Sequence, residues 1–397
     1  MTDVMVTGAG VVAPNGLSPG DYWTAVLSGR SGIRPTTATG PVASPAPLSG
    51  QVDAFVAKEH LPGRLLPQTD PMTRYALFAA GRAIEESGVE PDAPLDMGVI
   101  TASASGGFDF GQRELQHLWS EGPDHVSAYM SFAWFYAVNT GQISIRHGLR
   151  GPVGVLVTEQ AGGLDAVAHA RRKIVAGARL MVTGGMDSSL CPYGLAAQVR
   201  SGRLSTGSDP ATAYLPFDRR ARGHVPGEGG AMFTLEEADG QDRRGYGRIA
   251  GYGASFDPPP GSGRPSTLVR AIETALSDAD VTPAEVAMVI ADAAAVPELD
   301  AAEAEALAAV FGPRGVPVTA PKTLTGRLYS GAGPLDILTA LLALRDGVVP
   351  PTANVTDVDP ELPVDLVLGA PRPASGTAAL VVARGFGGFN SAMVVRA

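Results

Sequence analysis

The sequence has few of the residues on which redox, metal and hydrolytic sites depend. Its single cysteine, Cys191, excludes an internal disulfide and a multi-cysteine zinc site, and so fits a reducing cytoplasm. None of the six histidines stands at a metal-ligand spacing from a second ligand, and no serine lies in a Gly-x-Ser-x-Gly turn. A metalloenzyme or a serine hydrolase is therefore poorly supported.

Charge and long apolar runs are also scarce. Charged residues make up 18% of the chain, only three residues are lysine, and the net charge of -10 argues against nucleic-acid binding. No stretch approaches the ~18 apolar residues of a membrane span, and the first residues do not form a signal peptide. We expect a soluble cytoplasmic protein with no membrane or nucleic-acid partner. Its low charge indicates either a surface covered by a partner or an Ala- and Arg-rich coding bias.

Strand-like and helix-like segments alternate along the 397 residues, which predicts an α/β fold. Ala161-Gly-Gly-Leu-Asp165 and Ala332-Gly-Pro-Leu-Asp336 agree at four of five positions, and each opens a predicted helix that leads to a strand. We infer two related halves, residues 1–240 and 241–397, which meet in the polar stretch from Glu237 to Arg248.

No nucleotide cofactor is indicated. Gly8-Ala-Gly10 follows a strand as a dinucleotide-binding loop would, but Pro14-Asn-Gly16 then makes a turn where that motif needs a helix.

Three motifs carry a family resemblance that runs from end to end. They are Val6-Thr-Gly-Ala-Gly-Val-Val-Ala-Pro-Asn-Gly16, Leu215-Pro-Phe-Asp-Arg219 with Gly227-Glu-Gly229, and Gly385-Phe-Gly-Gly388. The chain resembles the β-ketoacyl synthases, and within them the chain-length factors, or ketosynthase-β subunits, of type II polyketide synthases. The resemblance implies a thiolase-like, five-layered αβαβα fold with two pseudo-repeated halves.

The same resemblance implies that the reactive residues have been replaced. Active relatives use a cysteine thiolate and two histidines, and the shared Gly-Leu-Asp run places Gln160 at the cysteine position. Ala291-Asp-Ala293 and Lys322-Thr-Leu-Thr-Gly326 place Asp292 and Arg327 at the histidine positions. A carboxamide cannot form a thioester, so we expect no catalytic residue here and a vestigial site in which Asp292 and Arg327 form an ion pair.

Phe108, Gly111 and Leu115 are spaced i, i+3 and i+7, which puts them on one face of a helix. From the residues alone, a core stripe is the simplest interpretation. In chain-length factors the corresponding face lines the tunnel that receives the polyketide. The small Gly111 and Leu115 then predict a deep tunnel and a long, decaketide-like product.

A second aromatic segment contains Trp134, Phe135 and Tyr136 in a chain with only 6% aromatic residues. Such residues are favoured at the centres of interfaces, although a helix inside the core explains the composition equally well. In the family, this region and the strand before Gln160 help to form the dimer.

The expected function is that of a non-condensing subunit. A ketosynthase-α partner would supply the cysteine and histidines, an acyl carrier protein would deliver malonyl units on a phosphopantetheine arm that enters the partner, and the growing polyketide would occupy the shared tunnel. No directly bound cofactor and no metal are expected, and whether the chain is itself an enzyme stays open.

Two alternatives involve this chain's own chemistry. Gln160 could assist decarboxylation of malonyl-carrier protein to supply an acetyl primer. Cys191 could instead serve an independent condensing enzyme, although its position before Pro192 favours a buried structural thiol. The final product and the primer unit are not readable from the sequence.

Overall fold

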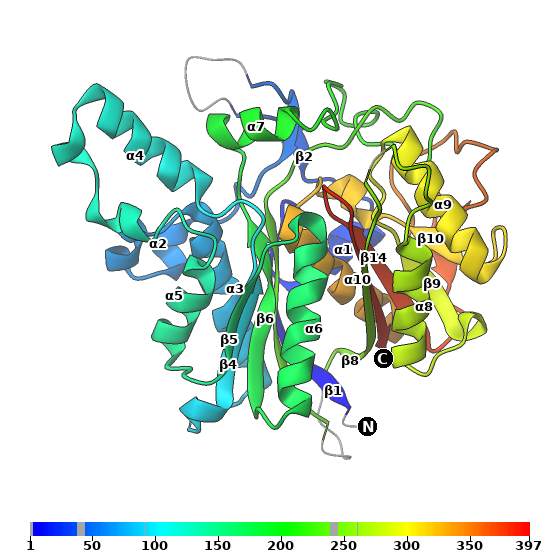
Figure 1. Ribbon diagram of the computed structural model, residues 1–397, viewed down its shortest axis with the longest axis horizontal. Helices are drawn as coiled ribbons and strands as arrows, with labels where there is room; N and C mark the ends of the chain where they lie inside the picture. The colour runs from blue at the N-terminus through cyan, green and yellow to red at the C-terminus, as the bar shows by residue number, and fades with distance from the viewer. Residues whose placement is uncertain (1–2, 38–43, 91, 239–244, 260) are drawn as a thin grey trace.

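The computed structural model describes residues 3–37, 44–90, 92–238, 245–259 and 261–397 (Figure 1). The predicted boundary between residues 240 and 241 lies outside these ranges. Within them, ten α-helices are formed: α1 (Pro19–Leu27), α2 (Ala57–His60), α3 (Pro71–Ser87), α4 (Phe108–Ser120), α5 (Val138–His147), α6 (Gly162–Val175), α7 (Pro192–Val199), α8 (Leu268–Asp278), α9 (Pro297–Phe311) and α10 (Ala332–Asp346).

The strands of the described residues are β1 (Val4–Val12), β2 (Ile33–Pro35), β3 (Leu48–Gly50), β4 (Met97–Ala102), β5 (Val153–Leu156), β6 (Leu180–Asp187), β7 (Gly229–Glu237), β8 (Gly247–Phe256), β9 (Val286–Ile290), β10 (Pro317–Thr319), β11 (Val348–Val349), β12 (Asp365–Leu366), β13 (Arg372–Pro373), β14 (Ala378–Arg384) and β15 (Phe389–Arg396). The segment Gly385-Phe-Gly-Gly-Phe-Asn390 is the turn of a hairpin, because β14 and β15 pair antiparallel on either side of it.

The sheet order reveals the internal repeat. In one half the order is β5-β4-β6-β7-β1, and in the other it is β10-β9-β14-β15-β8, with β12 added at the edge. The pairings correspond one to one: the first two in each half are parallel and the last two antiparallel. The predicted pseudo-repeated halves are therefore confirmed.

Three hydrophobic cores produce five layers. One core packs α3 and α5 against the first half-sheet, and another packs α8 and α9 against the second. The central core holds α6 and α10 between the two half-sheets. Hydrogen bonds between Met5 and Val6 of β1 and Gly247 and Arg248 of β8 join the half-sheets into one continuous sheet. The thiolase-like αβαβα fold is confirmed.

Each half presents the same kind of turn before its central helix. The turn Glu159–Ala161 precedes α6, and the turn Tyr329–Gly331 precedes α10. Both begin with a residue in the left-handed region, with φ near 52° at Glu159 and at Tyr329. The two turns lie against each other, with the Ser330 hydroxyl donating to the Glu159 carbonyl at 2.8 Å.

No described helix combines the length and the apolar character that a membrane crossing requires.

The close crossing of α6 and α10 depends on glycine. A Cβ on Gly163 would stand 2.3 Å from both the Pro334 side chain and the Ser330 carbonyl oxygen. We expect Gly163→Ala to lower the free energy of unfolding by about 1–3 kcal/mol, because the backbone cannot give way cheaply. Denaturant titration at matched protein concentration measures the change.

The matched control is Gly81→Ala inside α3, where the added Cβ approaches only the His147 ring at 4.0 Å. This substitution should raise stability by roughly 0.5–1 kcal/mol. Equal effects of the two substitutions would contradict the packing argument.

Candidate functional site

Gln160 lies in a strand-turn-helix connection, as its sequence context predicts. Strand β5 ends at Leu156, the turn Glu159–Ala161 follows, and α6 begins at Gly162. The Gln160 side chain is 1% exposed, and neither polar atom of its carboxamide has a hydrogen-bond partner among the described residues. The position at the helix N-terminus suits a nucleophile, but the group that occupies it is a buried neutral amide.

Glu159, immediately before Gln160, is a residue that the sequence did not single out. Its left-handed backbone favours glycine, so a glutamate there must be held by its contacts. One carboxylate oxygen accepts from the amide of Gln160 at 2.7 Å and from the amide of Phe386 at 2.9 Å. Glu159 therefore connects the turn to the closing loop around Phe386.

The loop that carries Asp292 is held by two buried carboxylates of α9. Glu303 accepts from the amides of Asp292 and Ala293, and Asp300 accepts from the amide of Ala295. Ala293 and Ala295 both have positive φ angles, so these bonds stabilise a strained loop. Asp300 and Glu303 therefore act as supports of the loop that carries Asp292.

The predicted ion pair between Asp292 and Arg327 is confirmed. Two guanidinium nitrogens of Arg327 lie 3.2 Å from the two carboxylate oxygens of Asp292, and both side chains are almost fully buried. Arg384 completes the contact, since its amide donates to Asp292 at 2.8 Å and its carbonyl accepts from Arg327 at 2.8 Å. The pair joins the ends of β9 and β14 to the segment before α10.

Electrostatics favour the charged form of Arg327. Burial disfavours the charge of Arg327, but the Asp292 carboxylate outweighs it and raises the pKa of the guanidinium. Burial and the neighbouring Asp292 both raise the pKa of Glu303. Burial likewise raises the pKa of Asp300 to about 8, against the hydrogen bond from Phe217. Arg327 thus stays cationic, and it cannot act as the proton-transferring group that a histidine would be.

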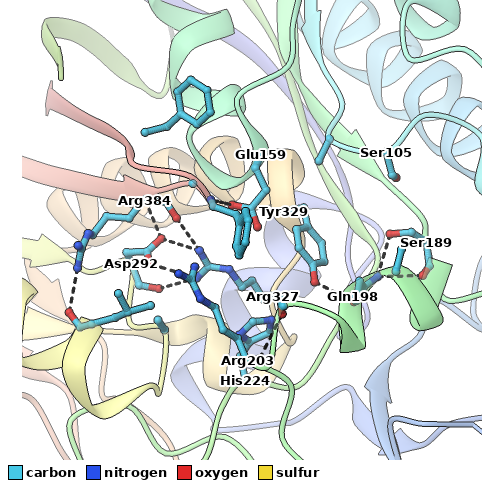
Figure 2. A pocket seen from close by; sticks show the side chains of 18 of the residues that line it. Ser105, Glu159, Ser189, Gln198, Arg203, His224, Asp292, Arg327, Tyr329 and Arg384 are labelled. Carbon is cyan, nitrogen blue, oxygen red and sulfur yellow. Dashed lines mark hydrogen bonds and ion pairs between the residues drawn. The ribbon is translucent and has the colours of Figure 1, made fainter. Parts of the chain in front are cut away.

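A cavity of about 380 Å³ opens beside the ion pair (Figure 2). Glu159, Asp292 and Arg327 line it, whereas Gln160 does not. Of the three predicted vestigial residues, Asp292 and Arg327 therefore lie on the cavity wall. The third, Gln160, is buried behind its neighbour Glu159. Phe108 also lines the cavity, which places the start of α4 at the same space.

The face predicted on α4 is helical, but it is not a core stripe. Gly111 is buried, where an added Cβ would make ordinary contact with Trp134 at 3.5 Å. Leu115 is 40% exposed and Trp119, one turn further, is 84% exposed. Figure 1 shows α4, in cyan, at the periphery of the molecule. The face therefore has an apolar outer edge that this chain alone does not cover.

Trp134, Phe135 and Tyr136 lie in turns before α5, and their side chains are 38–47% exposed. The alternative that they belong to a buried core helix is wrong, because these residues form turns, are partly exposed and precede α5, which begins only at Val138. Strand β5, at the open edge of the sheet, exposes Val153. Exposed aromatic groups and an unpaired apolar strand edge are features of an interface.

Cys191 caps the N-terminus of α7, where its sulfur accepts from the amide of Gly194. The side chain is buried, and burial raises its pKa to about 11. Since a thiol in this state is a poor nucleophile, the prediction of a structural thiol is confirmed and an independent condensing role loses support.

The sequence also missed polar residues that meet only through the fold. Arg203, His224, Tyr329 and Arg384 come from four separated segments and all line the cavity. Lys322, one of only three lysines, forms a second buried ion pair with Asp336, 2.9 Å apart. The sequence signalled this pair only through the rarity of lysine and the position of Asp336 at the end of the repeated pentapeptide.

Breaking the Asp292–Arg327 pair on one side should be costly. Arg327→Met would leave the Asp292 carboxylate buried without its cation, and we expect a loss of about 3–5 kcal/mol in unfolding free energy. The double variant with Asp292→Asn, which keeps an acceptor for the Arg384 amide, should recover at least ~1 kcal/mol of that loss. Strictly additive losses in denaturant titrations would show that the two charges are not coupled.

Comparisons with known proteins agree with this geometry. The family described as "Beta-ketoacyl synthase, N-terminal domain" matches residues 1–240, and "Beta-ketoacyl synthase, C-terminal domain" matches residues 246–356. The chain is 60% identical to a Streptomyces coelicolor protein named as β-ketoacyl synthase 2 of the actinorhodin polyketide, over 99% of this chain and 98% of that one.

It is also 58% identical to the tetracenomycin polyketide synthase ketoacyl synthase beta subunit of Streptomyces glaucescens, over 99% of this chain and 98% of the other. Among solved structures, a β-ketoacyl synthase from Burkholderia phymatum is similar with a TM-score of 0.90 at 25% identity, covering 100% of this chain and 99% of that one. The chain belongs to the β-ketoacyl synthase family.

Proposed function

We propose that this chain is a non-condensing ketosynthase-β subunit, or chain-length factor, of a type II polyketide synthase. One observation carries the proposal: the two positions where active relatives have histidines hold a buried ion pair, Asp292 with Arg327, and Gln160 stands at the cysteine position. These three positions provide neither the thiol nucleophile nor the two imidazoles that condensation requires. Relatives at 58–60% identity bear the names of polyketide synthase subunits of this kind.

The condensing chemistry then belongs to a ketosynthase-α partner. It would extend a poly-β-ketone by decarboxylative condensation of malonyl units held on an acyl carrier protein. The exposed face formed by Leu115, Trp119, residues 134–136 and the edge of β5 supports heterodimer formation, because it combines apolar side chains with unpaired strand backbone. The phosphopantetheine arm of the carrier would enter the partner, in the cytoplasm.

This chain would contribute part of the tunnel that receives the growing polyketide. The face of α4 containing Phe108, Gly111 and Leu115 lies next to the exposed aromatic segment, since Gly111 adjoins Trp134. Small residues at 111 and 115 leave depth for a long, decaketide-like chain. The bulk on this face would set the length at which elongation stops.

Enlarging side chains on this face should shorten the product. We expect Gly111→Leu and Leu115→Phe, reconstituted with the ketosynthase-α and a carrier protein, to release chains shorter by one or more two-carbon units. Mass spectrometry of the products measures the shift. The side chain added at residue 111 would fill the space next to Trp134 rather than displace backbone, since its Cβ would make an ordinary contact with Trp134 at 3.5 Å.

Gln116→Phe is the matched control, because Gln116 is exposed on another side of the same helix. It should leave product length unchanged. Unchanged product mass in both tunnel variants, with normal total yield, would refute the role of this face.

A second candidate is that Gln160 assists malonyl decarboxylation to supply an acetyl primer. It is favoured by the unpartnered carboxamide, whose N–H groups could donate to an enolate oxygen. Against it stand the deep burial of Gln160 and its absence from the cavity wall.

Gln160→Ala separates these candidates when the partner's catalytic cysteine is also removed. If Gln160 stabilised the enolate, carbon dioxide release from malonyl-carrier protein would fall by about 10²–10³-fold. Because the amide is buried away from the cavity, we expect release to change by less than about twofold. A loss of the larger size would establish the decarboxylase instead.

A further inference from the structure

The cavity beside the ion pair contains a cation that forms no ion pair with the described residues. Arg203 lines the cavity with its guanidinium carbon 4.8 Å from the centre of the Phe386 ring. No carboxylate of the described residues lies within ion-pair distance of Arg203, whereas Arg327 next to it is paired with Asp292. Burial, followed by the charge of Arg327, lowers the pKa of Arg203, and the more distant carboxylates of Glu159 and Asp292 oppose this shift only in part, so an anion bound to Arg203 would stabilise its charge.

The aromatic platform under Arg203 is held in place. The amide of Phe386 donates to Glu159, which also binds the amide of Gln160. A cation stacked on a fixed ring loses less rotational freedom when it binds a ligand. Arg203 is therefore positioned before any ligand arrives.

A neutral histidine lies beside it. His224 is 4% exposed, and its ring centre lies 6.4 Å from those of Tyr214 and Tyr329. Its amide donates to the Arg203 carbonyl, and Figure 2 shows the two residues together. Burial, followed by the charges of Arg327 and Arg203, lowers the pKa of His224 well below its ordinary value. The backbone of Ala294 opposes this shift, but neither ring nitrogen has a partner of hydrogen-bonding geometry among the described residues.

Part of the remaining wall is apolar. Phe108, Leu299 and Phe389 line the same space, whose volume of about 380 Å³ is in the range of small-molecule sites. The site thus combines the guanidinium of Arg203, a neutral imidazole and aromatic side chains, on a wall that also carries Arg200, Arg384 and the carboxylate of Glu159.

We propose that this cavity binds a small organic carboxylate, with the carboxylate on Arg203, a hydrogen bond from His224, and an aromatic or aliphatic body against Phe108 and Phe389. The planar guanidinium matches the two oxygens of a carboxylate. The inference goes beyond the proposed function and does not depend on it.

The test is calorimetric titration of the complete complex of this chain and its partner with 2-naphthoate. We expect saturable binding that Arg203→Gln weakens by about tenfold or more, the loss typical of a charged hydrogen-bonding pair. Arg264→Gln, an exposed position outside the cavity wall, should leave the affinity unchanged. Since the partner subunit is identical in all samples, its own sites cancel from the comparison.

Neutral 2-naphthamide provides a second measurement that needs no variant. It should bind the unmodified complex at least about tenfold more weakly than naphthoate, because it brings no charge to Arg203. Absence of naphthoate binding, equal binding by Arg203→Gln, or equal affinity for the amide would overturn the proposal. Displacement of naphthoate by inorganic phosphate at similar concentration would overturn the preference for a carboxylate.

Discussion

The buried contact between Asp292 and Arg327 is the interaction on which the rest of the site depends. The sequence motifs predict that it stands at the two histidine positions of active relatives, and it ties the end of β9 to the end of β14 through Arg384. Two opposite charges buried together are costly to remove singly, because the charge that stays has lost its partner. The site therefore cannot regain proton-transfer chemistry by one substitution, and Gln160 is only one part of its conversion.

Much of this was readable from the sequence because the signals were local. Strand and helix patterns, the repeat at Ala161 and Ala332, and the motif positions of Asp292 and Arg327 needed no three-dimensional information. The repeat was read one residue out of phase: Ala161 ends a turn, whereas Ala332 is already the first residue of α10. Short glycine-rich matches fix helix starts only to within such a shift.

The rest of the site depends on contacts that no pattern reports. Arg203 lies in an irregular loop, and its neighbour His224 looked like any isolated histidine until the fold placed both on one cavity. Glu159 is next to Gln160 in the sequence, yet its positive φ angle and its hydrogen bond with the Phe386 amide are seen only in the folded structure. The continuity of the sheet through β1 and β8 likewise arises from two sequence-distant edges.

The low charge content had left two explanations open, a covered surface or a coding bias. The structure favours the covered surface, since Leu115, Trp119 and the aromatic residues 134–136 are exposed beside the unpaired edge of β5. A chain that lacks the catalytic cysteine and histidines and exposes an apolar face needs a partner subunit to function. Its fold preserves the shape of a condensing enzyme, while its surface and the face of α4 are available to a partner.

The central claim is that this chain shapes the product but never carries it covalently. Intact-protein mass spectrometry of both subunits, quenched during turnover with malonyl-carrier protein, tests this most directly. The account predicts acyl adducts on the partner subunit and an unmodified mass for this chain. A stable acyl adduct on this chain, at Cys191 or elsewhere, would contradict it.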